Sequence, residues 1–289
     1  MSTLRHLTAL EPSYPSRLRK LSRPPSTITV QGGSLEAERT VAIVGSRAAH
    51  PDAAAFARHL AATLVRSGIV VVSGGALGID AAAHRGALDA GGRTWAVTGT
   101  GSDHCFPTEH APLYAEIAAS PGAMVWPFAP AANARAGGFM LRNRVLTALS
   151  DAVVVVQAGL PSGALHAAAC AIRQRVPLWV VPAAPWMGRG FAGSRRLLEQ
   201  GARPVHAVDA LLASLGLGVR RPSHPPSRPL SESETAVLGA TSAAPLHLDE
   251  IASRAQSPAP AVLASLLTLA LEDVVVEGPP GFFRRPLSP

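Results

Sequence analysis

Short valine-rich runs alternate with amphipathic stretches along the first two thirds of the chain, and this alternation most constrains the fold. The runs "VAIVG" (41–45) and "IVVVSGG" (69–75) are followed by 51–68 and 79–92, which have helical periodicity. Strands with little polar alternation are buried on both faces, which is typical of parallel sheets covered by helices. Further strands are expected at 94–99, 123–128, 152–159 and 177–183, and further helices at 139–152 and 162–175. We therefore predict an α/β domain with a doubly wound, mostly parallel sheet.

The C-terminal part of the chain has a different pattern. Residues 217–229 are rich in proline and arginine and lack apolar periodicity, which predicts an exposed linker. In 230–289, two expected helices (246–255 and 259–273) precede two short strands around a Pro-Pro-Gly turn, which is a winged-helix pattern. We therefore predict a domain at 1–216, with a short N-terminal extension at 1–38, and a winged-helix domain at 230–289.

The formal net charge of +7 is unevenly distributed. Residues 1–216 carry 20 Lys and Arg against 12 Asp and Glu, 217–229 carry 3 against none, and 230–289 carry 3 against 7. Lys20 is the sole lysine, so a general preference for arginine explains part of the arginine count but not the asymmetry. A basic body joined to an acidic tail predicts that the body alone binds a polyanion.

The number of cysteines and the hydropathy of the sequence indicate the cellular compartment. Cys105 and Cys170 are too few for a disulfide framework, which favours a reducing cytosol. No apolar run long enough for a signal peptide or a membrane span is present. We therefore expect a cytoplasmic protein without a membrane partner.

Three loops that follow expected strands carry residues suited to binding an anion. They are "GSR" (45–47), "SGGALGID" (73–80) and "PSGALHA" (161–167). Ligands of open parallel sheets bind outside the carboxyl ends of the strands, and free N–H groups at a helix start attract anions. The three turns together therefore predict a phosphate site at one edge of the sheet.

Two arginines flank Asn143 in "LRNRVLTALSDAVVVVQAG" (141–159), near the start of an expected helix. Cations are disfavoured there by the helix dipole, by ~0.3–1 kcal/mol each. A bound anion would remove this conflict for Arg142 and Arg144. The alternatives to a bound anion are a salt bridge to Asp151 or a solvent-exposed face of the helix. The absence of any acid from 152 to 198, where five arginines occur, favours the anion.

An ordered series of stretches resembles the DNA-processing protein A (DprA/Smf) family. They are "YPSRLRKLSRPPSTITVQG", "VAIVGSR", "SGGALGIDAAAHRGAL", "GGRTWAVTGTGSDHCFP", "FMLRNRVLTALSDAVVVVQAG", "SGALHAAACA" and "SRRLLEQGARPV". The resemblance covers roughly residues 14–206, and the tail resembles the winged helix of that family. It implies an extended Rossmann-like fold, homodimerisation, single-stranded DNA binding in a basic pocket, and loading of the RecA recombinase in DNA uptake, natural transformation and recombination.

The same resemblance assigns the DNA-binding residues. The residues that match the family motifs and are expected to contact phosphates are Arg47, Ser73, Gly74, Gly78, Arg142, Asn143, Arg144, Ser162 and Gly163. The chain departs from the family at Leu77, where an arginine is usual, at Ala164, where a hydroxyl is usual, and at Gln157, where an acid is usual.

An enzyme is the alternative. Phosphoribohydrolases of the same fold superfamily release bases from nucleotides with a glutamate in the corresponding "PSGALHAAAC" segment, where this chain has no carboxylate. His166 and Cys170 lie four residues apart without a second pair, so no metal site is predicted. We therefore expect binding without catalysis, cofactor or metal.

Overall fold

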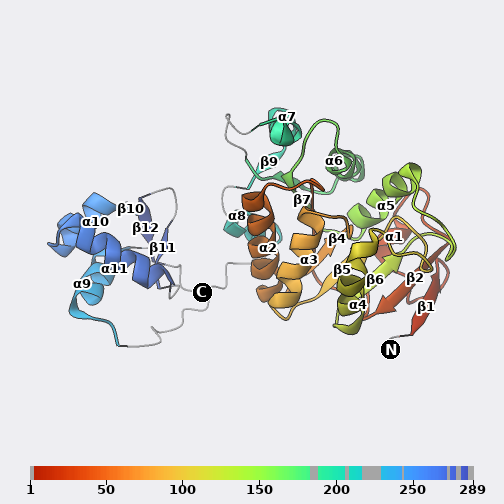
Figure 1. Cartoon of the computed structure of the whole chain (residues 1–289). Coiled ribbons are helices and arrows are strands. Elements are labelled where there is room, and N and C mark those ends of the chain that lie inside the picture. Colours follow the sequence, from red (N-terminus) through yellow and green to blue (C-terminus); the bar gives the residue numbers. More distant parts are fainter. Residues whose placement is uncertain are drawn as a thin grey trace. The chain divides into compact units, whose positions relative to one another are not determined.

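The computed structural model describes residues 3–182, 188–205, 208–216, 229–242, 244–271, 274–277 and 281–285. The chain forms two compact units, Met1–Leu211 and Leu212–Pro289 (Figure 1). The predicted linker at 217–229 lies outside the described residues except for Pro229.

A nine-stranded sheet in the order β1-β2-β6-β5-β4-β3-β7-β8-β9 organises the first unit. The strands are β1 (Leu4–Thr8), β2 (Thr27–Gly32), β3 (Thr40–Gly45), β4 (Val70–Ser73), β5 (Thr94–Val97), β6 (Ala123–Trp126), β7 (Ala152–Gln157), β8 (Leu178–Val180) and β9 (Arg203–Pro204). All pairs from β6 to β9 are parallel, whereas β1 and β2 pair antiparallel at one edge. The predicted doubly wound, mostly parallel sheet is confirmed.

Helices cover both faces of this sheet. They are α1 (Ser16–Arg19), α2 (Pro51–Arg66), α3 (Ile79–Asp89), α4 (Ala111–Ala119), α5 (Ala136–Ala148), α6 (Gly163–Gln174) and α7 (Ala192–Glu199). A further helix, α8 (Val208–Ser214), contains the boundary between the two units. Figure 1 shows α2, α3 and α4 side by side on one face. On the other face, Leu18 of α1, Leu146 of α5 and Ala168 of α6 pack into one core cluster with strand residues such as Val155.

The N-terminal stretch belongs to the sheet, although the sequence indicated only a short extension at 1–38. Strand β2 pairs with β6, and β1 pairs with β2. Tyr14 and Leu18 between them are buried at 1% and 0% exposure. Because β1 buries only Leu7, its sequence lacks the continuous apolar run by which the inner strands are recognised.

The order of the strands creates a crevice at one edge of the sheet. Strand β3 pairs with β4 on one side and β7 on the other, and the chain builds outward in both directions from this pair. Such a topological switch point separates the loops at the carboxyl ends of the two central strands and leaves room for a ligand. The loops after β3 and β7 are therefore where a site is expected.

The second unit has a three-stranded sheet in the order β10-β12-β11. Its elements are α9 (Glu232–Ala240), β10 (Leu246–His247), α10 (Leu248–Ala255), α11 (Ala259–Leu271), β11 (Val276–Glu277) and β12 (Phe282–Arg284). Ile251, Leu266 and Phe283 form part of its own core. The predicted winged helix is confirmed, with α9 as an additional helix that begins with a capping box at Ser231.

Candidate nucleic-acid interface

A cavity of about 440 Å³ lies outside the carboxyl ends of β3 and β7. Its lining includes the turn from Gly45 to Ala48 after β3, the turn from Gly159 to Gly163 after β7, and Arg142 and Asn143 of α5. The cavity therefore occupies the switch point of the sheet, as the three glycine-rich turns predicted.

Close contacts between backbones hold the turns in place. The N–H of Ile79 donates to the carbonyl of Ser46 at 3.2 Å. Gly78 has φ +76°, and a Cβ there would lie 2.3 Å from the Ser46 oxygen, so only glycine fits between the two turns. The turns after β3 and β4 consequently form one rigid wall.

A buried ion pair lies behind this wall. Arg142 is 5% exposed and Asp80 is 4% exposed, with 3.9 Å between Arg142 Nη1 and Asp80 Oδ2. The Asp80 carboxylate also accepts from the N–H groups of Gly74 (3.1 Å) and Ala76 (3.4 Å). Burial raises the pKa of the Asp80 carboxyl above its usual value, against the opposing effect of Arg142, and burial lowers the pKa of Arg142.

An exposed cation and two aromatic rings form the mouth of the cavity. The guanidinium of Arg47 lies 5.1 Å from the centre of the Phe139 ring, and Phe139 contacts Phe106 with 5.6 Å between ring centres. Phe106 is 42% exposed. These residues, together with Leu77, line a smaller hollow of about 60 Å³ beside the cavity.

The start of α6 forms the opposite side of the cavity. Ser162 caps this helix, and its hydroxyl accepts from the N–H of Ala164 at 3.1 Å. The Asn143 amide donates to the Gly163 carbonyl at 3.2 Å and ties α5 to this turn. The N-terminal end of α6 thus faces the cavity with its partial positive charge.

Five of the nine predicted phosphate-binding residues line this one cavity: Arg47, Arg142, Asn143, Ser162 and Gly163. Gly74 lines the smaller hollow. Ser73 and Gly78 support the turns, since the Ser73 hydroxyl is fully buried and donates to the Ile43 carbonyl at 2.6 Å.

Arg144 lies elsewhere, in a groove on the other side of α5. The salt bridge to Asp151 that was the alternative for the two arginines is made instead by Arg17, at 2.9 Å.

Two residues that depart from the family have structural roles, and the third is at the mouth. Gln157 is 3% exposed, and its Oε1 accepts from the His50 N–H at 2.8 Å. Ala164 is buried in the cavity wall. Leu77 is 42% exposed and lines the hollow beside Arg47, so it adds an apolar edge where a cation is usual.

The structure adds residues to which the sequence reasoning gave no role or only a weak one. Asp80 is part of a family motif, but its role as the partner that holds Arg142 is not visible in the sequence, because the two lie on separate elements. From the sequence, Phe106, Phe139 and Trp126 could contribute to base stacking, although each such residue is more often part of a core. In the structure, Trp126 is only 6% exposed and belongs to the core. Trp126 lies in the expected strand at 123–128, and this position is the signal by which its burial could have been predicted.

In the described part of the chain, no group of three or more His, Cys, Asp or Glu residues is placed so that it could hold a metal ion. His166 Nδ1 and Cys170 Sγ lie 3.8 Å apart on α6, and Cys170 is buried. Among the described helices, none is long and apolar enough to cross a membrane.

Comparisons with known proteins point to one family. The protein-family model for "DNA recombination-mediator protein A" matches residues 5–216, and the family model for "DprA winged helix domain" matches residues 221–281. The chain is 33% identical over 281 residues to Protein Smf of Escherichia coli, covering 94% of this chain and 75% of that protein. It spans about half the length of some other curated relatives.

Two solved structures agree with this similarity. The DNA processing protein A (DprA) of Streptococcus pneumoniae has a TM-score of 0.68 and 29% identity, covering 73% of this chain and 74% of that chain. The DNA processing protein A of Helicobacter pylori has a TM-score of 0.66 and 29% identity, covering 74% of this chain and 98% of that chain. The structure from Helicobacter pylori is described as giving insight into a single-stranded DNA binding mode.

Proposed function

The chain belongs to the DNA recombination-mediator protein A (DprA/Smf) family, and we propose that it binds single-stranded DNA without sequence preference in the cavity at the switch point. A role in DNA processing follows from the family. The assignment of this cavity to the single strand, and of the residues that contact it, is our proposal.

The observation that carries the proposal is the placement of Arg47. It is exposed, it lines both the cavity and the smaller hollow, and no acidic side chain in the described residues pairs with it. The one carboxylate in the cavity lining, Asp80, is already bonded to two N–H groups and faces Arg142. The Arg47 guanidinium is therefore available for a phosphate.

The aromatic rings favour a single strand over a duplex. Phe106 and Phe139 lie at the mouth beside Arg47, where an unpaired base could stack on them. The bases of a duplex are stacked on each other and cannot reach such rings without being extruded, which costs a few kcal/mol. Phosphates and ring faces carry no base identity, so we expect little sequence preference.

Binding without turnover is the form of activity that we propose. A phosphoribohydrolase needs a free carboxylate beside the glycosidic bond. Within the described residues, Asp80 alone supplies a carboxylate to the cavity, and its Oδ2 already accepts from two N–H groups and faces Arg142. Incubation with nucleoside monophosphates is therefore expected to release no base.

The family resemblance alone supports three finer proposals. We propose that a homodimer of this chain hands the strand to the RecA recombinase, that it acts in natural transformation and recombination, and that it does so in the cytoplasm. Co-sedimentation with RecA on single-stranded DNA tests the first of these.

The central test compares wild type with the Arg47→Gln variant on single-stranded and duplex oligonucleotides. We expect wild type to prefer the single strand. Arg47→Gln should weaken that binding and reduce its salt slope by ~0.7, because the variant neutralises one phosphate fewer. Arg66→Gln, an exposed cation on α2 that lines neither cavity, is the matched control. Equal affinity for duplex, or an unchanged slope for Arg47→Gln, would contradict the proposal.

A further inference from the structure

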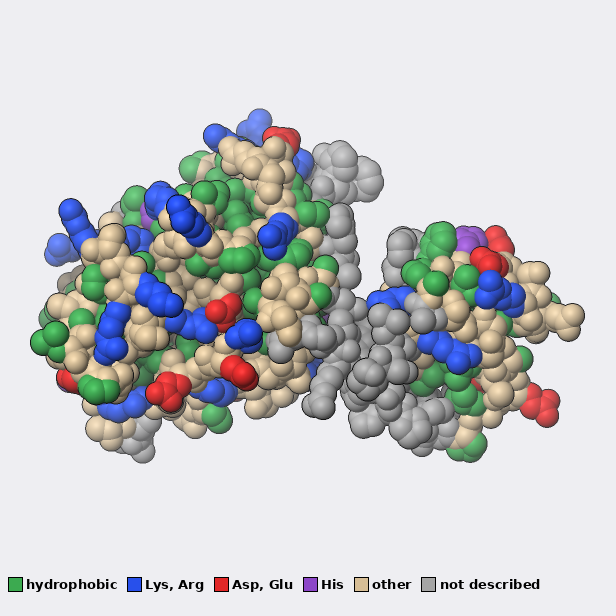
Figure 2. Space-filling model, turned by 180° about the vertical axis from the view of Figure 1, so that it is seen from behind, with side chains coloured by type: hydrophobic (Ala, Val, Ile, Leu, Met, Phe, Trp, Pro, Cys, Tyr) green, Lys and Arg blue, Asp and Glu red, His purple; other side chains and the backbone are tan. Residues whose placement is uncertain are grey.

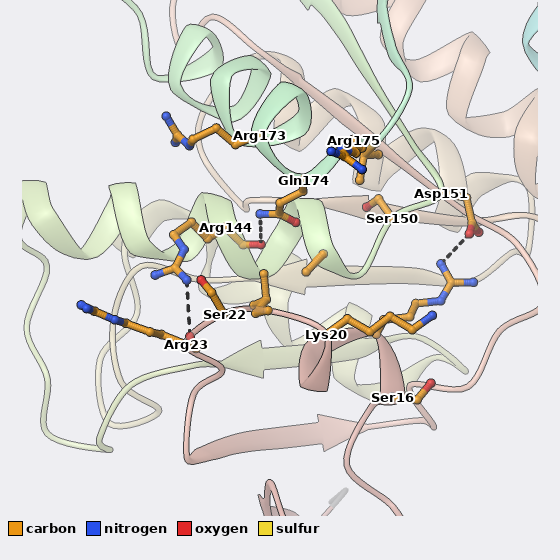
Figure 3. A pocket seen from close by; sticks show the side chains of 14 residues that line it. Ser16, Lys20, Ser22, Arg23, Arg144, Ser150, Asp151, Arg173, Gln174 and Arg175 are labelled. Atoms are coloured by element: carbon orange, nitrogen blue, oxygen red, sulfur yellow. Dashed lines mark hydrogen bonds and ion pairs between the residues drawn. The ribbon is translucent and has the colours of Figure 1, made fainter.

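A second group of basic side chains lies on the other side of α5. It surrounds a groove of about 1110 Å³. Figure 3 shows Arg173 and Arg175, from the end of α6, on one side of the groove and Lys20 and Arg23, after α1, on the other, with Arg144 of α5 between them. Figure 2 shows the face opposite to that seen in Figure 1, where Lys and Arg side chains are widely spread and acidic ones are few.

The positive charge of the groove is not balanced by acidic side chains. Among the described residues, the only acid in the lining of the groove is Asp151. It pairs with Arg17, and its Oδ2 accepts from the N–H and hydroxyl of Thr40 at 2.8 and 3.1 Å. Asp151 is therefore used to fasten α1 to the sheet. Over the described ranges of the chain, the other five cations of the lining take part in no ion pair.

Backbone contacts fix the basic residues around the groove. The Gln174 amide donates to the Arg144 carbonyl at 3.1 Å, and the Arg144 guanidinium donates to the Arg23 carbonyl at 3.4 Å. Arg175 has φ +57° at the C-cap of α6, a left-handed conformation that Gly or Asn usually adopts. An arginine there costs about 1–2 kcal/mol relative to a right-handed conformation, so its side chain needs another reason to be present.

Helix electrostatics explain only part of this cluster. The negative end of the α6 dipole stabilises Arg173 and Arg175 by ~0.3–1 kcal/mol each. It does not account for Lys20, Arg23 and Arg144, which come from two other segments and repel the first two. A bound polyanion would relieve that repulsion.

We propose that this groove is a second contact site for the single strand, and that it binds backbone phosphates beyond the cavity. The inference rests on the proposed function. Arg142 and Arg144 are two residues apart on α5, so at 100° per residue their side chains leave opposite sides of the helix. Helix α5 thus separates the cavity from the groove. A helix is ~10–12 Å across, which about three stacked nucleotides span at ~3.4 Å each.

The consequence is a dependence on strand length. A strand of about four nucleotides is too short to occupy the cavity, cross α5 and reach the groove, whereas one of about twenty can contact both. Changes in the groove should therefore affect long strands more than short ones.

The test uses the double variant Arg23→Gln/Arg173→Gln in the full chain, with oligothymidylates of about four and about twenty nucleotides. Both side chains are exposed, so the fold should tolerate the changes. The matched control is Arg58→Gln/Arg66→Gln on α2, which removes the same charge on the opposite face of the sheet. We expect the groove variant to bind the long strand about five- to tenfold more weakly, with a salt slope smaller by ~1.4, and the short strand as wild type does.

Each outcome decides between the alternatives. An unchanged affinity for the long strand, an equal loss on both lengths, or an equal loss in the control would overturn the second site. Failure of wild type to bind either strand would instead overturn the proposed function itself.

Discussion

Burial determines what each charged residue at the switch point can do. Arg142 and Asp80 are both almost fully enclosed, and no described residue hydrogen-bonds to the Arg142 Nε. Removal of one member of such a pair leaves the other as a buried, uncompensated charge, at a cost of ~3–5 kcal/mol. We therefore regard Arg142 as a residue that shapes the cavity, and Arg47 as the residue whose charge can be tested without loss of the fold.

The sequence predicted Arg47 and Arg142 as residues of this site, but it did not predict how the charged residues of the site are arranged. Residues two apart on a helix point in opposite directions, so the separation of Arg142 from Arg144 follows once the helix is predicted. The pairing of Arg142 with Asp80 does not follow, since no rule of periodicity connects residues on α5 and α3. That information is present only in the packing of the two helices against the sheet.

His84 leads to a prediction at this scale. His84 is fully buried. The Thr94 hydroxyl donates its hydrogen to the Val71 carbonyl, so the Thr94 oxygen accepts from the His84 Nδ1–H at 2.7 Å. The other ring nitrogen, Nε2, has no hydrogen-bond partner in the described part of the chain. Burial lowers the pKa of His84 to about 3, with smaller contributions from His110 and Arg142.

The sign of the pH effect follows from this pKa. Between about pH 6.5 and 3 the unfolded chain binds a proton at His84 that the folded chain does not, so the free energy of unfolding falls as the pH falls through this range. From pH 7 to about 4.5, urea titrations should show wild type losing about 2 kcal/mol more than His84→Gln. His59→Gln, an exposed histidine on α2, should behave as wild type. Equal losses in wild type and His84→Gln would contradict this.

Among the elements, the inner strands and the helices between them were predicted best. The predicted helix at 51–68 is α2 (Pro51–Arg66), and the predicted strand at 152–159 is β7 (Ala152–Gln157). Both have an unbroken apolar pattern because their apolar side chains are buried in the core. Strands β1 and β9 lie at the edges of the sheet, where few side chains are buried, so their sequences carry little signal.

The turn after β4 gives a prediction at the scale of elements. A Cβ at Gly74 would lie 1.3 Å from Arg142 Nη1, so Gly74→Ala must displace the buried guanidinium. We expect a loss of ~1–3 kcal/mol in the free energy of unfolding, together with weaker binding of single strands. Gly137→Ala in α5 is the control. Apart from its chain neighbours and the backbone of its own helix, no described atom lies within 4 Å of the position that a Cβ would take there.

A double-mutant cycle identifies the cause of that loss. If the clash with Arg142 is responsible, Gly74→Ala should cost little further stability in an Arg142→Ala background. A full additional loss in that background would show that the turn itself, and not the arginine, rejects the side chain.

On the scale of the whole molecule, charge separates the two units. The difference in net charge between residues 1–216 and 230–289 can be read directly from the sequence, since it depends only on composition. In a winged helix that reads DNA, the second helix must bring donors to phosphates and base edges. Residues 255–283, which include α11, contain no Lys or Arg. Arg254 pairs with Glu250 at 2.6 Å, and the Arg285 Nε donates to the Leu238 carbonyl at 3.0 Å.

We therefore predict that residues 230–289 fold in isolation but show no measurable DNA binding at moderate salt. Net negative charge repels the phosphate backbone, and the cations whose contacts are described are already occupied within the unit. A chain shortened to 1–216 should bind single strands within a few-fold of the affinity of the full chain, and circular dichroism of the isolated tail should show helix. Binding of duplex DNA by the folded tail would overturn this prediction. Arg284→Gln and Arg285→Gln would then identify the contact, because these two residues are on and directly after β12 of the wing.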